Sequence, residues 1–248
     1  MKLNSSQKQK FNDDGYIILD IFSDAELENF KLSVNKIVDF QINDSIKNKK
    51  KFDLKKSKNL LKNISSLEKL GNEYVSDLGD FLTGLPESMQ LIGNKKIKDI
   101  VNELLNCEGN DPIYVTNATP IIALPNDEDY TYKFHKDTFY TIPYSKFIQI
   151  WAPLIENATV KNGALQICSK SHKNNWQGQF IKQNVPNRHR FQVTKDETSK
   201  YKIIDCTLKL GQVLFFNPGI AHQSGKNRSK KARVSLVGVY HKIKNNKI

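Results

Sequence analysis

Cysteine is scarce in this chain, and long apolar runs are absent. The three cysteines, Cys107, Cys168 and Cys206, are odd in number and widely spaced among 248 residues, which fits neither a disulfide framework nor a zinc site. No apolar run approaches the length of a membrane span, and residues 1–8 lack the apolar stretch of a signal peptide. We therefore expect a cytoplasmic protein with reduced thiols that does not enter a membrane.

Arginine is nearly missing from an otherwise basic chain. Only four of the 38 basic residues are arginine, although the formal net charge is +12. A basic protein suggests a nucleic-acid partner, but the lysines are spread along the chain, without a concentrated arginine or aromatic platform. Spread lysines are typical of a solvated surface. We therefore expect no nucleic-acid partner, while the basic surface favours an anionic small molecule as substrate.

Helical signals dominate the first part of the chain. Ser5 or Ser6 can begin a short helix that Gly15 ends, and Ser23 or Asp24 can begin a long amphipathic helix. Further segments are expected as a strand at 16–20, an exposed lysine-rich connection at 44–62, and helices at about 65–82 and 97–105.

From about residue 112 the pattern changes to short apolar runs separated by turn residues. These runs predict strands at 113–124, 131–134, 147–154, 164–168, 201–204, 213–216 and 233–241. Many short strands with Gly, Pro and Asn between them are typical of a β-sandwich or barrel. We expect one domain over residues 1–248, mainly β, with a helical part at about 1–110 packed against a jelly-roll core at about 111–248.

The most informative pair is His135 and Asp137, which lie two residues apart. Along an extended strand, residues i and i+2 point to the same face, so an imidazole and a carboxylate would meet at one point. The pair alone is weak, because His-X-Asp often arises by chance. A third ligand from a distant strand would complete the two-histidine, one-carboxylate facial triad of non-haem Fe(II) oxygenases.

A later segment supplies that third ligand. Residues 210–219 read as a turn, a strand and a second turn, and they deliver His222 just after the strand ends. Arg233 and Ser235 then begin another strand with both side chains on one face. A planar guanidinium suits a carboxylate better than a lysine does, which makes Arg233 a candidate anion clamp.

At these residues the sequence closely resembles the phytanoyl-CoA dioxygenase family of Fe(II)/2-oxoglutarate oxygenases. The resemblance covers nearly the whole chain. Its motifs are the opening segments 11–19 and 22–27, His135-Lys136-Asp137, the central segments 148–154 and 162–165, and the closing residues His222, Asn227, Ser229, Arg233 and Ser235.

The resemblance implies a double-stranded β-helix, or cupin-like jelly roll, that binds Fe(II) through His135, Asp137 and His222. It implies 2-oxoglutarate as co-substrate, held by Arg233 with Ser235 and Trp151 nearby. The implied reaction hydroxylates an unactivated C–H bond with O2 and forms succinate and CO2. Related halogenases carry a small residue in place of the carboxylate, so Asp137 favours hydroxylation, while desaturation and cyclisation stay open.

Residues 176–201 form a polar stretch without clear periodicity, which favours a substrate lid over a plain surface loop. Candidate substrate-binding residues are Trp176, Arg188 and Arg190 in this stretch, together with Tyr140 soon after the first metal motif. The arginines would face an anionic group, whereas His241 near the end of the chain is expected at the surface.

Two other functions stay open beside the hydroxylase. One is a catalytically inactive jelly-roll module that only binds a ligand, and the other is an oxygenase acting on nucleic acid, which the charge alone suggests. Acyl-CoA, amino acid, sugar and natural-product substrates are equally compatible with the sequence, as are a monomer and a homodimer.

Overall fold

The computed structural model describes residues 1–47, 56–108, 111–127, 132–139, 146–174, 179–180 and 191–243. The helices of this part are α1 (Ser5–Asp14), α2 (Asp24–Lys47), α3 (Leu60–Leu67), α4 (Asn72–Gly84), α5 (Pro86–Ile92), α6 (Lys95–Leu104) and α7 (Lys195–Thr198), with short 3-10 turns at Asp137–Phe139 and Ser171–Lys173. None of these helices is both long and apolar enough to cross a membrane.

The strands pair in antiparallel sheets. The largest sheet has the order β1-β8-β3-β10-β2, a smaller sheet has the order β7-β4-β9, and β5 pairs with β6. Their bounds are β1 (Tyr16–Asp20), β2 (Ile113–Ala123), β3 (Phe147–Pro153), β4 (Leu165–Cys168), β5 (Gln179–Phe180), β6 (Phe191–Gln192), β7 (Ile203–Cys206), β8 (Gln212–Phe216), β9 (His222–Gln223) and β10 (Arg233–Lys242).

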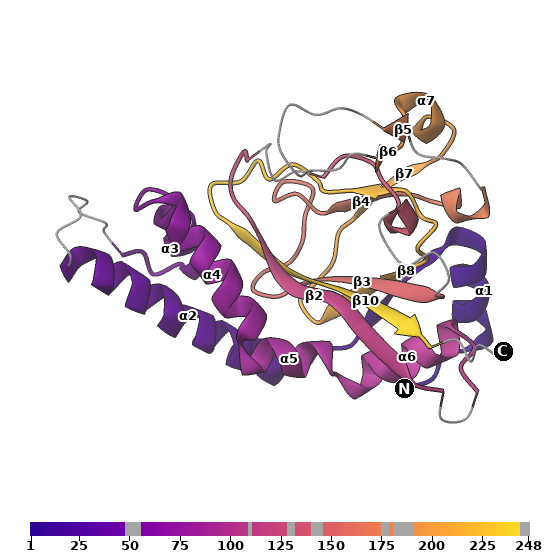
Figure 1. The fold of residues 1–248 in the computed structure, drawn as a ribbon, viewed down its shortest axis with the longest axis horizontal. Helices are drawn as coiled ribbons and strands as arrows, with labels where there is room; N and C mark the ends of the chain where they lie inside the picture. The colour runs from indigo at the N-terminus through magenta and orange to yellow at the C-terminus, as the bar shows by residue number, and fades with distance from the viewer. Residues whose placement is uncertain are drawn as a thin grey trace.

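The five-stranded sheet forms the middle of the molecule. Figure 1 shows helices α2 to α6 along one side of β2 and β10, and the small sheet with β4 and β7 on the other side. Helices α4 and α5 contact β2 directly. One large apolar core joins the helices to the near face of the central sheet, and a second, smaller core lies between the two sheets.

The central strands are buried on both faces. Side chains along a strand alternate between faces, and on β10 Val234, Leu236 and Tyr240 enter the helix-side core. The alternate residues Arg233 and Ser235 line a pocket on the other face instead. The same strands therefore build the core and the candidate site.

The N-terminal part is not separate from the sheet. Helix α1 begins with a capping box at Asn4 and ends at Gly15, whose left-handed φ of 84° turns the chain directly into β1. Strand β1 then pairs with β8, with Tyr16 opposite Phe216. The N-cap is Asn4 rather than the predicted Ser5 or Ser6, while the second helix begins as predicted at Asp24.

Several predicted boundaries were wrong. The expected helix at 65–82 is two helices, α3 and α4, which Gly71 separates with a φ of 148°. Helix α2 runs to Lys47 and α3 begins at Leu60, so little of the described part of 44–62 is a connection. Residues 132–134 form no strand, although the neighbouring His135 makes an isolated bridge.

Candidate metal centre and pocket

Two histidines meet at the edge of the small sheet. His135 and His222 exchange two backbone hydrogen bonds, each 3.0 Å long between N and O, and form an isolated antiparallel bridge. Their rings lie 4.3 Å apart between centroids. His222 itself belongs to β9, which pairs with β4. Backbone pairing therefore brings together two imidazoles that are distant in the sequence.

Backbone carbonyls orient both rings. The Nδ1 atom of His135 lies 2.7 Å from the carbonyl oxygen of Lys133, and that of His222 lies 3.1 Å from that of Ile220. A carbonyl only accepts, so each Nδ1 carries the proton and donates. The lone pair of each ring is then on Nε2, which is the atom that remains to bind a metal.

Asp137 completes the cluster from a turn rather than from a strand. Residues Asp137–Phe139 form a 3-10 turn, so the predicted extended geometry of the His-X-Asp pair was wrong at Asp137. Its Oδ1 atom nevertheless lies 3.4 Å from Nε2 of His135. One ligand atom from each of His135, Asp137 and His222 lies within 4.8 Å of the others, as one ion with three protein ligands requires.

His222 is buried in largely apolar surroundings. The ring of Phe216 meets its edge at 5.0 Å between centroids. Burial, with His135 close by, lowers the pKa of His222 to about 4. The imidazole is therefore neutral at pH 7, which is the form that binds metal ions.

Arg233 is a buried cation on β10. It is 4% exposed, and burial lowers its pKa to about 10. Its Nη1 donates a 3.4 Å hydrogen bond to the carbonyl oxygen of Asn162, and its guanidinium lies 5.5 Å from the ring centroid of Trp151. Its Nε has no hydrogen-bond partner, and no carboxylate pairs with it in the described part of the chain. Such a group needs an anion to offset its lost hydration.

Arg233 contacts the loop that carries Asn162 and Gly163, and this loop in turn meets a second loop, 225–229. Gly163 has a left-handed φ of 84°, and a Cβ there would lie 3.0 Å from Nη1 of Arg233 and 2.4 Å from the carbonyl oxygen of Gly225. In the second loop, the Asn227 amide donates to the carbonyls of Ala123 and Lys231. The Asn-Gly and Asn-X-Ser motifs of the sequence are therefore parts of the framework around the arginine.

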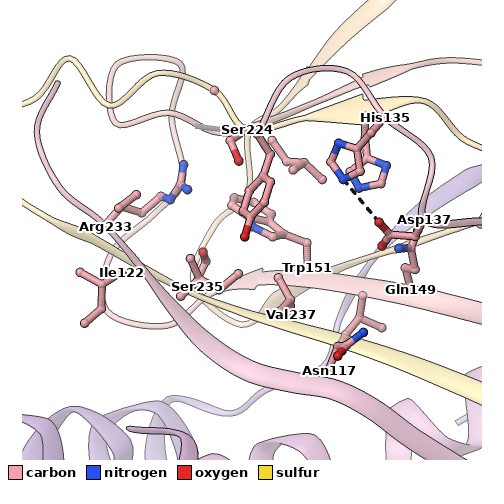
Figure 2. A pocket seen from close by; sticks show the side chains of 18 of the residues that line it. Asn117, Ile122, His135, Asp137, Gln149, Trp151, Ser224, Arg233, Ser235 and Val237 are labelled. Atoms are coloured by element: carbon pink, nitrogen blue, oxygen red, sulfur yellow. Dashed lines mark ion pairs between the residues drawn. The ribbon is translucent and has the colours of Figure 1, made fainter. Parts of the chain in front are cut away.

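A pocket of about 290 Å³ connects these groups. Figure 2 shows Arg233 and Ser235 toward one end, Trp151 in the middle, and His135 with Asp137 at the other end. Apolar side chains form much of the remaining wall, including Ile121, Ile122, Leu165, Phe216, Val237 and Val239. The pocket thus joins a candidate metal centre to a buried cation through a largely apolar space.

Two further polar side chains in this pocket lack partners. Ser235 is 1% exposed, and its Oγ makes no hydrogen bond. Gln149 on β3 is 3% exposed, and its Oε1 makes none either. Ser235 was among the predicted site residues, whereas Gln149 was not. Its signal in the sequence is a lone amide within the apolar strand Phe147–Pro153.

The structure brings together His135, Asp137, His222, Arg233 and Ser235, together with Trp151, around one pocket. The other predicted residues, Tyr140, Trp176, Arg188 and Arg190, lie outside the described residues, as does half of the expected lid at 176–201. His241, which the sequence suggested at the surface, is wholly buried and stacks on Tyr114 at 4.7 Å between ring centroids.

Comparison with known families and structures gives a consistent picture. The family model for phytanoyl-CoA dioxygenase matches residues 11–235. No curated protein matches the chain.

Similar solved structures share the fold at low identity. EvdO2 from Micromonospora carbonacea var. aurantiaca, complexed with 2-oxoglutarate, is 15% identical with a TM-score of 0.63 over 98% of this chain and 92% of its own. EctD from S. alaskensis, with 2-oxoglutarate and 5-hydroxyectoine, is 19% identical with a TM-score of 0.63 over 97% and 77%. The carbocyclase SnoK from nogalamycin biosynthesis is 14% identical with a TM-score of 0.60 over 97% and 84%.

Proposed function

This chain belongs to the phytanoyl-CoA dioxygenase family of non-haem iron and 2-oxoglutarate-dependent oxygenases, and we propose that it hydroxylates an unactivated C–H bond of a small molecule. The observation that carries the proposal is one pocket with a His-Asp-His cluster at one end and an unpaired, buried arginine at the other.

The donor set fits iron. Two neutral imidazole nitrogens and one carboxylate oxygen are the facial triad of non-haem Fe(II) enzymes, which leaves positions open for other ligands. We assign His135, Asp137 and His222 as the ligands. The carbonyls of Lys133 and Ile220 hold the rings with Nε2 available, and such outer contacts fix ligand orientation before a metal arrives.

The other end of the pocket fits 2-oxoglutarate. Arg233 has an Nε without a partner, and Ser235, two residues along the same face of β10, has a hydroxyl without one. A carboxylate would satisfy both, since a guanidinium forms charge-assisted, bidentate bonds to it. The ring centroid of Trp151 lies 5.5 Å from the guanidinium carbon, and we assign all three residues to co-substrate binding.

The reaction converts substrate C–H, O2 and 2-oxoglutarate into C–OH, succinate and CO2. Iron and 2-oxoglutarate would supply the activation of O2 that no protein side chain provides. The protein orients the co-substrate through Arg233 and excludes water with Phe216, Val237 and Leu165 around the cluster. Because SnoK is a carbocyclase, ring formation stays an alternative outcome of the same oxidation.

We also propose that the chain is one domain with a jelly-roll core of the double-stranded β-helix type. The two facing antiparallel sheets support this, and the matched solved structures share the fold. Since β1 belongs to the central sheet, residues 1–110 are part of the domain rather than a separate unit. Localisation in the cytoplasm stays a prediction from composition.

The nature of the prime substrate stays a prediction too. The residues expected to bind an anionic group, Arg188 and Arg190, lie outside the described residues. In the described lining of the pocket, Arg233 is the one basic side chain besides the histidines.

The test is anaerobic reconstitution with Fe(II), followed by titration with 2-oxoglutarate. We expect the weak visible charge-transfer band of the iron chelate in the wild type. The band should be lost in His135→Ala, which removes a ligand, and should need much more 2-oxoglutarate in Arg233→Ala. Far-UV circular dichroism controls for folding of each variant.

Absence of the band in folded, iron-supplied wild-type protein would contradict an oxygenase. It would favour the alternative of a catalytically inactive ligand-binding module. A normal band in Arg233→Ala would leave the iron assignment intact and refute the role of Arg233.

A further inference from the structure

Gln149 is a buried amide with no partner beside the candidate iron site. It lies on β3, opposite Phe216 of β8 and Val239 of β10, and is 3% exposed. Its Oε1 makes no hydrogen bond, although the residue lines the pocket. A buried polar group without a partner opposes folding, and such groups concentrate where a ligand completes them.

The position of Gln149 separates it from the co-substrate end. Arg233 and Val239 are both on β10, six residues apart, which is about 20 Å along a strand. Gln149 pairs with Val239, so it lies at the far end from Arg233. Figure 2 shows it on the same side of the pocket as Asp137. A co-substrate bound between Arg233 and the metal would not occupy the Gln149 end of the pocket, which stays open to another ligand.

The charges of the lining decide what that ligand can be. Apart from the histidines, Arg233 is the one basic side chain that the described lining contains, and Asp127 and Asp137 are acidic. Among the described lining residues, a carboxylate or phosphate near Gln149 would find no basic side chain other than the histidines and Arg233 at the far end. An amide, by contrast, binds neutral donors and acceptors without a charge penalty.

We propose that Gln149 determines specificity by hydrogen-bonding an uncharged polar group of the prime substrate. The substrate is accordingly a neutral compound that carries a hydroxyl or amide close to the C–H bond that reacts. This rests on the proposed oxygenase function.

The test compares Gln149→Met with wild type. Methionine is close to glutamine in length and replaces the amide with an apolar thioether, so it largely preserves packing. Gln41→Met is the matched control, because Gln41 is also a buried glutamine whose Oε1 lacks a partner, but its Nε2 donates to the carbonyl of Tyr74 at 3.0 Å on the helical side.

The probes are pairs of a primary amide and the carboxylate with the same carbon skeleton, of increasing length, together with the matching alcohols. Stimulated release of succinate from 2-oxoglutarate is measured in air, and the melting temperature is measured without O2 in the presence of Fe(II) and 2-oxoglutarate. We expect the amides or alcohols, and not the matching carboxylates, to stimulate succinate release and to raise the melting temperature.

In Gln149→Met the response to the effective probe should weaken about tenfold, the loss expected for one hydrogen bond between neutral groups. Its iron–2-oxoglutarate band should match wild type, and its metal-free melting temperature should be equal or higher, because no bond is lost. Gln41→Met should melt earlier and respond normally.

Stimulation by carboxylates alone, or by no neutral probe, overturns the proposal. An unchanged response in Gln149→Met does the same. A lost band in that variant would make Gln149 a residue that positions the metal, and a lower melting temperature would make it structural. Failure of the oxygenase function itself is distinguishable, since the wild-type band would then be missing.

Discussion

The side chains of strand β10 are buried on both faces of the central sheet, but only those on the pocket face keep polar atoms without hydrogen-bond partners. On the helix side, Val234, Leu236 and Tyr240 of β10 are at most 2% exposed, and even the Tyr240 hydroxyl donates to the carbonyl of Ile92 at 2.7 Å. On the pocket side, Arg233 and Ser235 of the same strand are at most 4% exposed and retain polar atoms without partners.

The difference shows where a ligand belongs. Equal burial means that the β10 side chains of both faces have given up hydration, but only those of the helix side, Val234, Leu236 and Tyr240, keep no polar atom without a partner. Changes on the two faces should therefore alter unfolding free energy in opposite directions, and the following predictions test this.

Phe215→Ala should have the largest effect, which is a loss of unfolding free energy. Phe215 on β8 is fully buried on the helix side. Its removal leaves a cavity that costs about 3–5 kcal/mol. Urea unfolding monitored by circular dichroism measures the loss. The folded fraction should still bind 2-oxoglutarate with near wild-type affinity, and a loss of binding equal to that in Arg233→Ala would contradict the separation of the faces.

Arg233→Met should change stability with the opposite sign. Burial lowers the pKa of Arg233 to about 10, which reflects the cost of keeping its charge in the interior. Replacing a buried charge with an apolar side chain of similar size can stabilise a protein by about 1–4 kcal/mol. Loss of the contact with Trp151 offsets part of this, so we expect about 1 kcal/mol in metal-free urea unfolding.

The same variant should no longer be stabilised by 2-oxoglutarate. With Fe(II) present, the co-substrate should raise the melting temperature of wild type and have little effect on Arg233→Met, because binding to the folded state stabilises it by mass action. Arg233→Lys is the control for charge, since it retains the cation and loses the bidentate geometry. If metal-free Arg233→Met were less stable than wild type, the claim that the buried Arg233 charge lowers the stability of the ligand-free protein would be refuted.

The sequence predicted the helix-side framework well. Strands β2, β3, β8 and β10 were expected within two residues of their observed bounds. For β3, β8 and β10 the reason is that strands buried on both faces appear as largely apolar runs. His135, Asp137, His222 and Arg233, which the resemblance singled out, do line one pocket, and their roles stay a prediction.

The sequence predicted the pocket side less completely. The 3-10 turn at Asp137 was missed because a two-residue spacing fits an extended strand as well as a turn. Gln149 was overlooked because one amide in an apolar strand indicates nothing until its lack of a partner is known. His241 was misplaced because its burial depends on stacking with Tyr114 of a distant strand. Each miss depends on tertiary contacts rather than on local pattern.

His172 offers the smallest test, an unpartnered atom outside the pocket. Its Nε2 donates to the carbonyl of Asn12 at 3.0 Å, and its Nδ1 is buried without a partner. Burial lowers the pKa of His172 below 6.5; Lys173 and Lys136 act in the same direction, while the Asn12 bond and Asp14 oppose it. The unfolded chain therefore binds this proton more readily than the folded protein does.

This contribution is fully present above the unfolded pKa of about 6.5 and is lost as the pH falls below it. His172→Gln retains a donor for Asn12 without a group that titrates. The melting temperature of wild type, relative to this variant, should consequently fall between pH 8 and pH 5.5, measured without metal. Because no ligand is expected at His172, adding Fe(II) and 2-oxoglutarate should not abolish that relative loss. A ligand-dependent change would mean that unpartnered atoms outside the pocket also respond to binding, and it would weaken the contrast between the two faces.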